Sequence, residues 1–134
     1  MNGSRNNQEV LKKMREIYYK DISPRYDWMG YQITEDNKPS YHHIVKAEEL
    51  KKNEESYDAT VDNGAYLGKR SHELLHIIEQ IDEDLYESWN NVFQVINEGK
   101  KYPDEDVWKM VYYLRKETEE LIDKHKKSKS LIKS

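Results

Sequence analysis

The chain has 134 residues, of which 36% are hydrophobic and 36% charged, and its formal net charge is −4 at pH 7. This length suits one domain and is short for two. Cysteine is absent, which excludes disulfides and thiolate metal sites, so any bound metal must be held by imidazole, carboxylate or carbonyl groups or by water. There is no apolar run of membrane-spanning length and no signal-sequence pattern, so we expect a cytoplasmic protein that does not enter membranes.

The first element expected along the chain is a helix over residues 8–20. Apolar residues recur there at helical spacing, and Asn6 or Asn7 is available as its N-cap. The pair Ser23-Pro24 then interrupts the pattern, because a residue before proline disfavours helical backbone.

The next part of the chain is expected to be extended. Residues 26–45 mix aromatic and β-branched residues with turn-forming ones, which predicts two short extended segments around a turn. The charged stretch 46–60 has no hydrophobic pattern and predicts an exposed loop, with room for a helical turn. Residues 61–67 predict a turn followed by a short strand.

Three helices are expected in the remainder. Ser71 is a plausible cap for a helix that runs to about residue 81. A second helix covers residues 83–98 and ends at Gly99, and a third begins at Pro103 and runs into the lysine-rich end of the chain. The sequence therefore predicts an α+β fold that is mostly helical, with a small hairpin near its middle.

The last expected helix carries three aromatic residues. Trp108, Tyr112 and Tyr113 lie at helical spacing. We expect them to pack in the core and between helices rather than to form a platform on which nucleic-acid bases stack.

Most of the histidines are concentrated in one part of the sequence. Four of the five occur as an adjacent pair, His42-His43, and as an i,i+4 pair, His72 and His76. The i,i+4 pair places two imidazoles on one helix face, close enough to share a metal ion. A helical projection turns this face away from the main apolar stripe of the same helix.

The adjacent pair allows two roles, because neighbouring side chains of a strand face opposite ways. One imidazole of His42-His43 can turn toward the helix and its metal while the other serves a different purpose. Metal-assisted phosphodiester hydrolysis needs a cation that stabilises charge on the phosphate and a neutral histidine that takes a proton from water. Such a base needs a fixed tautomer, and Asn63, in a turn beside the second strand, is a candidate group to fix it.

Three stretches follow one another along the chain: Tyr41-His42-His43-Ile44-Val45, Asp62-Asn63-Gly64-Ala65-Tyr66-Leu67 and Ser71-His72-Glu73-Leu74-Leu75-His76. Together they resemble the motif of the HNH endonucleases, and their spacing is most similar to that of the colicin-type bacteriocin DNases. The family fold, called ββα-metal, is a hairpin packed on a helix with the metal between them. The resemblance covers about residues 26–80.

The resemblance also implies roles for single residues. His43 would be the general base that activates water, and Asn63 would orient it. Three histidines would be the metal ligands: His42, His72 and His76. The cofactor would be one divalent ion (Mg, Mn, Ni or Zn), and the reaction would be hydrolysis of phosphodiester bonds in DNA, with RNA as the other substrate to consider.

We therefore expect a single domain over residues 1–134 in which residues 26–80 form a ββα-metal core. The helix at 8–20 precedes this core, helices within 83–127 follow it, and residues 128–134 form a basic tail. Such a tail is either solvated and frayed or in contact with phosphate or a partner.

Three basic residues near the motif are candidates for binding phosphate: Lys46, Lys69 and Arg70. The leading hypothesis is a small DNA endonuclease, encoded by a phage or mobile element. The negative net charge weakens it, because neutralising phosphates needs Lys and Arg. A non-catalytic ββα-metal module that binds nucleic acid or a protein partner is the alternative, and a helical interaction protein with incidental histidines is the third.

Overall fold

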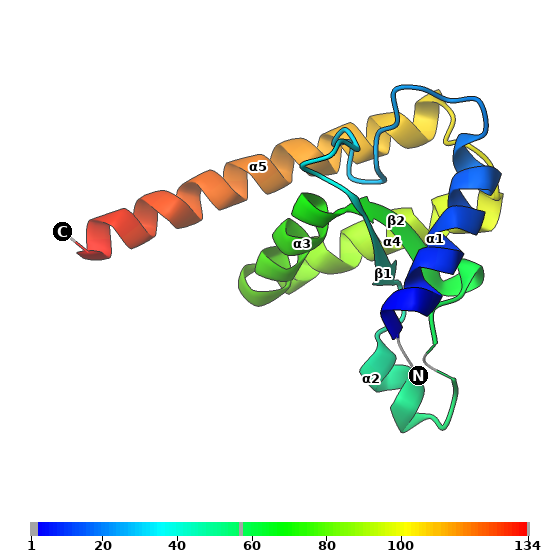
Figure 1. The fold of residues 1–134 in the computed structure, drawn as a ribbon. Coiled ribbons are helices and arrows are strands. Elements are labelled where there is room, and N and C mark those ends of the chain that lie inside the picture. Colours follow the sequence, from blue (N-terminus) through cyan, green and yellow to red (C-terminus); the bar gives the residue numbers. More distant parts are fainter. Residues whose placement is uncertain (1–2, 57, 134) are drawn as a thin grey trace.

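The computed structural model describes residues 3–56 and 58–133, with side chains described over 6–56 and 58–128. Along the chain its elements are α1 (Gly3–Tyr19), β1 (Pro39–His43), α2 (Ala47–Lys52), the 3-10 turn η1 (Val61–Asn63), β2 (Gly64–Gly68), α3 (Lys69–Ile81), α4 (Glu83–Gly99) and α5 (Glu105–Lys133) (Figure 1). The predicted α+β class is confirmed. Among the described residues, no helix is both long and apolar enough to cross a membrane.

The two strands form an antiparallel pair that leads directly into a helix. In its register His42 lies opposite Ala65 and His43 lies opposite Gly64. α3 starts at Lys69, immediately after β2 ends, so the strands and α3 form a hairpin-and-helix unit (Figure 1). The long connection between β1 and β2 contains α2 and η1, where the sequence predicted an exposed loop and a turn.

The segment before β1 is more irregular than its sequence pattern predicted. Of the two extended segments expected within residues 26–45, one is β1, while the other forms only isolated bridges, Tyr26 with Gln32 and Thr34 with Asn37. The hairpin therefore pairs β1 with the later strand β2, and not with the segment before it.

A buried carboxylate ties this irregular segment to the hairpin. Asp27 is fully buried, and its Oδ1 accepts hydrogen bonds from the backbone N–H groups of Met29 (3.0 Å) and Tyr31 (2.9 Å). Its Oδ2 accepts from the N–H of Gly68 at 2.7 Å, at the end of β2. Burial raises the pKa of Asp27, while these N–H donors act in the opposite direction.

The start of α3 is set by Asn37 and Gly68 rather than by the predicted cap. The carboxamide of Asn37 lies where a side chain on Gly68 would be, and its Oδ1 accepts from the N–H of Arg70 at 2.8 Å. Ser71, expected as the N-cap, is instead buried within the helix, because α3 begins two residues earlier at Lys69. Asn37 thus provides one of the acceptors that the first turn of a helix needs.

The other helix boundaries differ from the predicted ones at their ends. α1 begins at Gly3, so Asn6 lies inside it rather than capping it, and the Asn6 side chain accepts a hydrogen bond from the N–H of Ala59 at 3.0 Å. α5 begins at Glu105, and the side chain of Asp104, just before it, accepts a hydrogen bond from the N–H of Val107. The segment predicted as a basic tail is helical as far as Lys133, and Ser134 lies outside the described residues.

The core lies between α1, α4, the hairpin and the first half of α5. Its largest fully buried side chains include Trp28, Trp89 and Phe93. α5 packs on α4 there, and the indole N–H of Trp89 donates to the buried Thr118 hydroxyl at 2.9 Å. The C-terminal half of α5 extends away from the other elements (Figure 1).

The aromatic face of α5 is not buried as expected. Tyr112 is 56% exposed and Tyr113 64% exposed, while Trp108 is half-buried. Trp108 packs between the rings of Tyr102 and Tyr112, with centroid distances of 5.6 and 6.4 Å. The prediction of core packing is therefore wrong for Tyr112 and Tyr113, which lie on the outer face of the helix.

Candidate functional site

The four clustered histidines come together where β1, α3 and α4 meet. Their side chains line one cavity of about 270 Å³. Other residues that line it include Lys46, Glu48, Glu79 and Tyr86. The structure thus gathers in one place the histidines that the sequence separates by some thirty residues.

His42 is the buried member of the cluster. It lies on β1 and points toward α4, where its Nε2 is 2.8 Å from Oδ1 of the buried Asn90. Because a carboxamide oxygen only accepts, Nε2 carries the proton and Nδ1 keeps a free electron pair. Burial lowers the pKa of His42 from 6.5 to about 4, so the ring is neutral at pH 7.

His72 and His76 are on the same face of α3. Their ring centroids are 4.8 Å apart with planes 23° apart, and the His72 ring is 5.6 Å from that of His42. His72 Nδ1 is 2.7 Å from the hydroxyl oxygen of Ser40, and desolvation, followed by the neighbouring histidines, lowers the pKa of His72 to about 4. His76 is the open member, with a side chain that is 64% exposed.

Two of the ring spacings, His42 to His72 and His72 to His76, are compatible with imidazoles that share one metal ion. Two imidazoles that bind one ion at about 2.1 Å in tetrahedral geometry have centroids roughly 5 Å apart, close to the two distances found here. Metal-binding histidines are commonly held through their second ring nitrogen, the role that Asn90 and Ser40 have for His42 and His72. The donor atoms are not already converged, since no group of three His, Asp or Glu ready to hold an ion occurs among the described residues. Binding an ion therefore requires the rings to turn.

His43 lies opposite Gly64 in the hairpin, and Asn63 directly precedes Gly64. His43 is half-buried with its ring 4.8 Å from that of Tyr41, its neighbour on the same side of β1. Asn63 binds the backbone just after His43: its Oδ1 accepts from Val45 N–H at 2.8 Å, its Nδ2 donates to Val45 O at 3.0 Å, and its own carbonyl accepts from Ile44 N–H. The side chain of Asn63 thus fixes the main chain that follows His43.

The three basic candidates are placed differently from one another. Lys46 lines the histidine cavity, pairs with Glu79 and lies 5.3 Å from the centre of the Tyr86 ring. Lys69 is exposed at the first residue of α3. Arg70 precedes His72 by two residues, about 200° around the helix, and so lies on the other side of α3.

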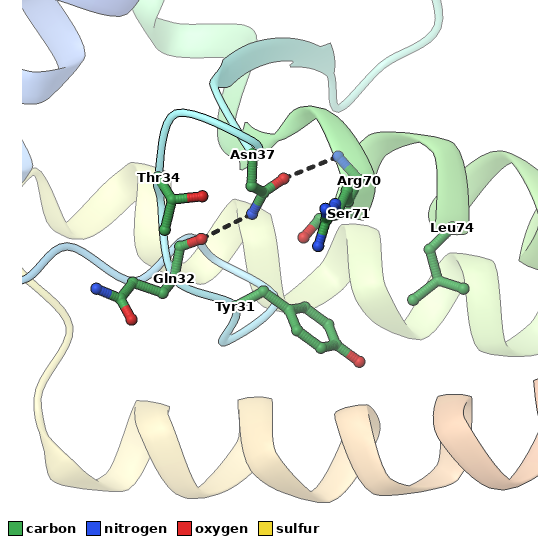
Figure 2. A pocket seen from close by; sticks show the side chains of 7 residues that line it. All are labelled: Tyr31, Gln32, Thr34, Asn37, Arg70, Ser71 and Leu74. Carbon is green, nitrogen blue, oxygen red and sulfur yellow. Dashed lines mark hydrogen bonds between the residues drawn. The ribbon is translucent and has the colours of Figure 1, made fainter.

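Arg70 there lines a separate cavity of about 420 Å³ that the histidines do not reach. Figure 2 shows this cavity between the start of α3 and the loop that carries Tyr31 and Asn37, with Leu74 along the helix. The structure therefore brings only Lys46, of the three predicted phosphate-binding residues, into the histidine cavity.

Three further residues of the site were absent from the sequence-based prediction. Glu79 follows His76 by three positions on α3, and its Oε1 is 3.8 Å from His76 Nδ1. That helical spacing is a signal by which it could have been found. Asn90 and Ser40 contact histidines only through the tertiary fold, so no local pattern marks them.

Comparison of the chain with protein-family models, curated proteins and solved structures gives no match. The chemistry of its own residues is therefore the basis for assigning a function to this chain.

Proposed function

We propose that this protein is a divalent-metal-dependent endonuclease of the HNH kind that hydrolyses phosphodiester bonds in DNA. The observation that carries the proposal is the meeting of His42 from the strand with His72 and His76 from the following helix, beside His43, in one cavity. The finer assignment to HNH enzymes comes from the resemblance of the motif in order and spacing.

Each residue then has a distinct task. His42, His72 and His76 hold the ion, and the lowered pKa values of His42 and His72 leave nitrogen electron pairs available on these two rings at pH 7. The bound ion supplies stabilisation of the charge on the phosphate and the leaving oxygen. His43 accepts the proton of the attacking water. Asn63 keeps the backbone after His43 in place.

The test is cleavage of supercoiled plasmid in the presence of Mg²⁺, Mn²⁺, Ni²⁺ or Zn²⁺ in turn. We expect nicked or linear product with at least one ion, and a His43→Ala variant slower by about 10²–10⁴-fold, the usual contribution of general-base catalysis. Val95→Ala is the control, because Val95 is 49% exposed on α4 and does not line the histidine cavity, so this variant should cleave at the wild-type rate. Undiminished cleavage by His43→Ala would exclude His43 as the base.

The second candidate function is a non-catalytic ββα module that binds a metal and a partner. The net charge of −4 favours it, since a nuclease must approach a polyanion. Absence of cleavage with every ion, together with a rise in melting temperature when Ni²⁺ or Zn²⁺ is added, would support this module.

A further inference from the structure

An ion pair that the sequence did not predict lies at the edge of the histidine cavity. Lys46, between β1 and α2, pairs its Nζ with Oε2 of Glu79 on α3, and the two side chains are 49% and 22% exposed. Lys46 is the one lysine or arginine among the described residues that line this cavity. The cation best placed to meet a phosphate is thus already bound to a carboxylate.

Glu79 also faces the proposed metal ligands. It follows His72 by seven residues and His76 by three, which places all three side chains on one face of α3. Its other carboxylate oxygen, Oε1, is 3.8 Å from His76 Nδ1. Glu79 lines the same cavity, and a carboxylate oxygen is a ligand that divalent cations readily accept.

We propose that the Lys46–Glu79 pair is an exchange latch, in which Glu79 leaves Lys46 for the bound divalent cation and Lys46 then binds the substrate phosphate. The latch rests on the proposed function, since it assumes the histidine metal site. It makes the binding of cation and phosphodiester mutually dependent: each ligand releases the side chain that the other needs.

The energetics allow such an exchange. A partly exposed Lys–Glu pair is weak, because solvent screens it, so either partner can leave it at small cost. Without a cation, Lys46 is paired with Glu79, and the carboxylates of Glu48 and Glu79 repel a phosphate that enters the cavity. Linkage requires the effect to be reciprocal, so a bound phosphodiester must raise the affinity for the cation by the same factor.

The first experiment measures phosphodiester binding without metal. The probe is dimethyl phosphate, titrated into the chelator-treated protein and followed by amide chemical shifts in NMR spectra, which also verify that each variant is folded. In Glu79→Gln, Lys46 is free at the start, and we expect binding about 2–5-fold tighter than in the wild type, as the free energy of a partly exposed ion pair allows.

Glu48→Gln is the matched control, because it removes the same charge from the same cavity without breaking the Lys46 pair. We expect it to change the affinity by less than about 2-fold, as a screened surface charge does. Equal gains in Glu48→Gln and Glu79→Gln would show a general effect of charge and overturn the latch, and so would no gain in either.

The second experiment measures the cation side with Zn²⁺. In Lys46→Met, Glu79 is free, so Zn²⁺ should bind more tightly than in the wild type, whereas Lys69→Met, outside the cavity, should match the wild type. Adding Zn²⁺ should tighten dimethyl phosphate binding in the wild type and do so less in Glu79→Gln.

The two proposals fail in different ways. A wild-type protein that binds none of Mg²⁺, Mn²⁺, Ni²⁺ and Zn²⁺ would overturn the metal site, and with it both the nuclease and the exchange. A protein that binds Zn²⁺ and cleaves DNA, but in which Glu79→Gln behaves like Glu48→Gln, would overturn the latch alone.

Discussion

At the scale of single residues, the protonation state of the His42 imidazole decides whether this side chain can bind a metal ion. A buried imidazole is costly to charge, and the Asn90 oxygen compensates the buried N–H without offering a negative charge. The pKa of His42 therefore falls to about 4. The ring stays neutral through the physiological range, as a metal ligand must, at the expense of stability when the solution is acidified.

This neutral state predicts a pH dependence of folding in the metal-free protein. Between pH 6.5 and about 4 the unfolded chain takes up the proton that folded His42 does not, so the free energy of unfolding must fall as the pH falls through this window. A change from 6.5 to about 4 corresponds to roughly 3 kcal/mol at full extent. Below pH 4 the contribution becomes constant, because both states are then protonated.

The free energy of unfolding of the metal-free protein can be measured by urea denaturation in the presence of a chelator, at steps from pH 7.5 to pH 4. The quantity to compare is the slope of the free energy of unfolding with pH, since His72, with its lowered pKa, adds to the fall in every variant and Asp27, with its raised pKa, opposes it. His42→Gln should lose part of the acid-dependent fall, and His125→Gln on α5 should keep it. Identical slopes for His42→Gln and the wild type would contradict a neutral buried His42.

At the scale of elements, the joint between β2 and α3 fixes the direction of the helix that carries His72 and His76. The carboxamide of Asn37 occupies the space beside Gly68, where a Cβ would collide with it. Gly68→Ala should therefore destabilise the protein by about 1–3 kcal/mol, the usual cost of forcing a methyl group into a packed site.

Gly99→Ala is the control for this prediction. Gly99 ends α4 in open surroundings, where the nearest atom to a new Cβ is Lys101 Cγ at 4.0 Å. Alanine is a better helix former than glycine, so this variant should be as stable as the wild type or slightly more stable. Equal midpoints for Gly68→Ala and Gly99→Ala in urea would mean that Asn37 moves aside easily and does not fix the joint.

The elements show where sequence reasoning succeeds. Hydrophobic spacing placed α3, α4 and α5 to within a few residues, because their buried faces repeat at the helical period. It misplaced the start of α3, since the acceptor for its first turn comes from Asn37, more than thirty residues away. It also left the partner of β1 open, because strand pairing depends on tertiary contacts that no single segment carries.

The candidate site likewise has one part that is local in sequence and could be predicted, and another part that depends on the tertiary fold. The i,i+4 pair His72 and His76 could be predicted from the sequence, as each member is local to one helix. The approach of His42 to that pair depends on the register of β1 with β2, and its orientation depends on Asn90 from α4. Arg70 shows the converse: two residues from His72 in sequence, it lies at another cavity across the helix.

At the scale of the whole molecule, charge is distributed unevenly. The net charge is −4, yet residues 124–134 contain five lysines and no acidic residue. This end of α5 extends away from the other elements, on the opposite side of the molecule from α1 (Figure 1). A negatively charged body with a projecting basic helix can attract a polyanion through the helix alone.

Within the proposed nuclease function, removal of residues 127–134 tests whether the basic end of α5 attracts DNA. It deletes Lys127, Lys129 and Lys133. Because the end of α5 projects from the body, the free energy of unfolding should change by less than about 0.5 kcal/mol, the typical effect of surface changes. Binding of a short DNA duplex, measured in the His43→Ala background, should weaken, and the slope of log affinity against log salt should become shallower by up to about 3.

The control removes three lysines from another place, by changing Lys12, Lys13 and Lys20 to Gln. All three are exposed on or just after α1, so the net charge changes by the same amount. If charge alone governs the approach of DNA, both proteins lose affinity equally, and α5 has no special role. If the projecting helix makes the phosphate contacts, only the truncation changes the salt slope, since counterion release counts the phosphates actually neutralised and not the overall charge.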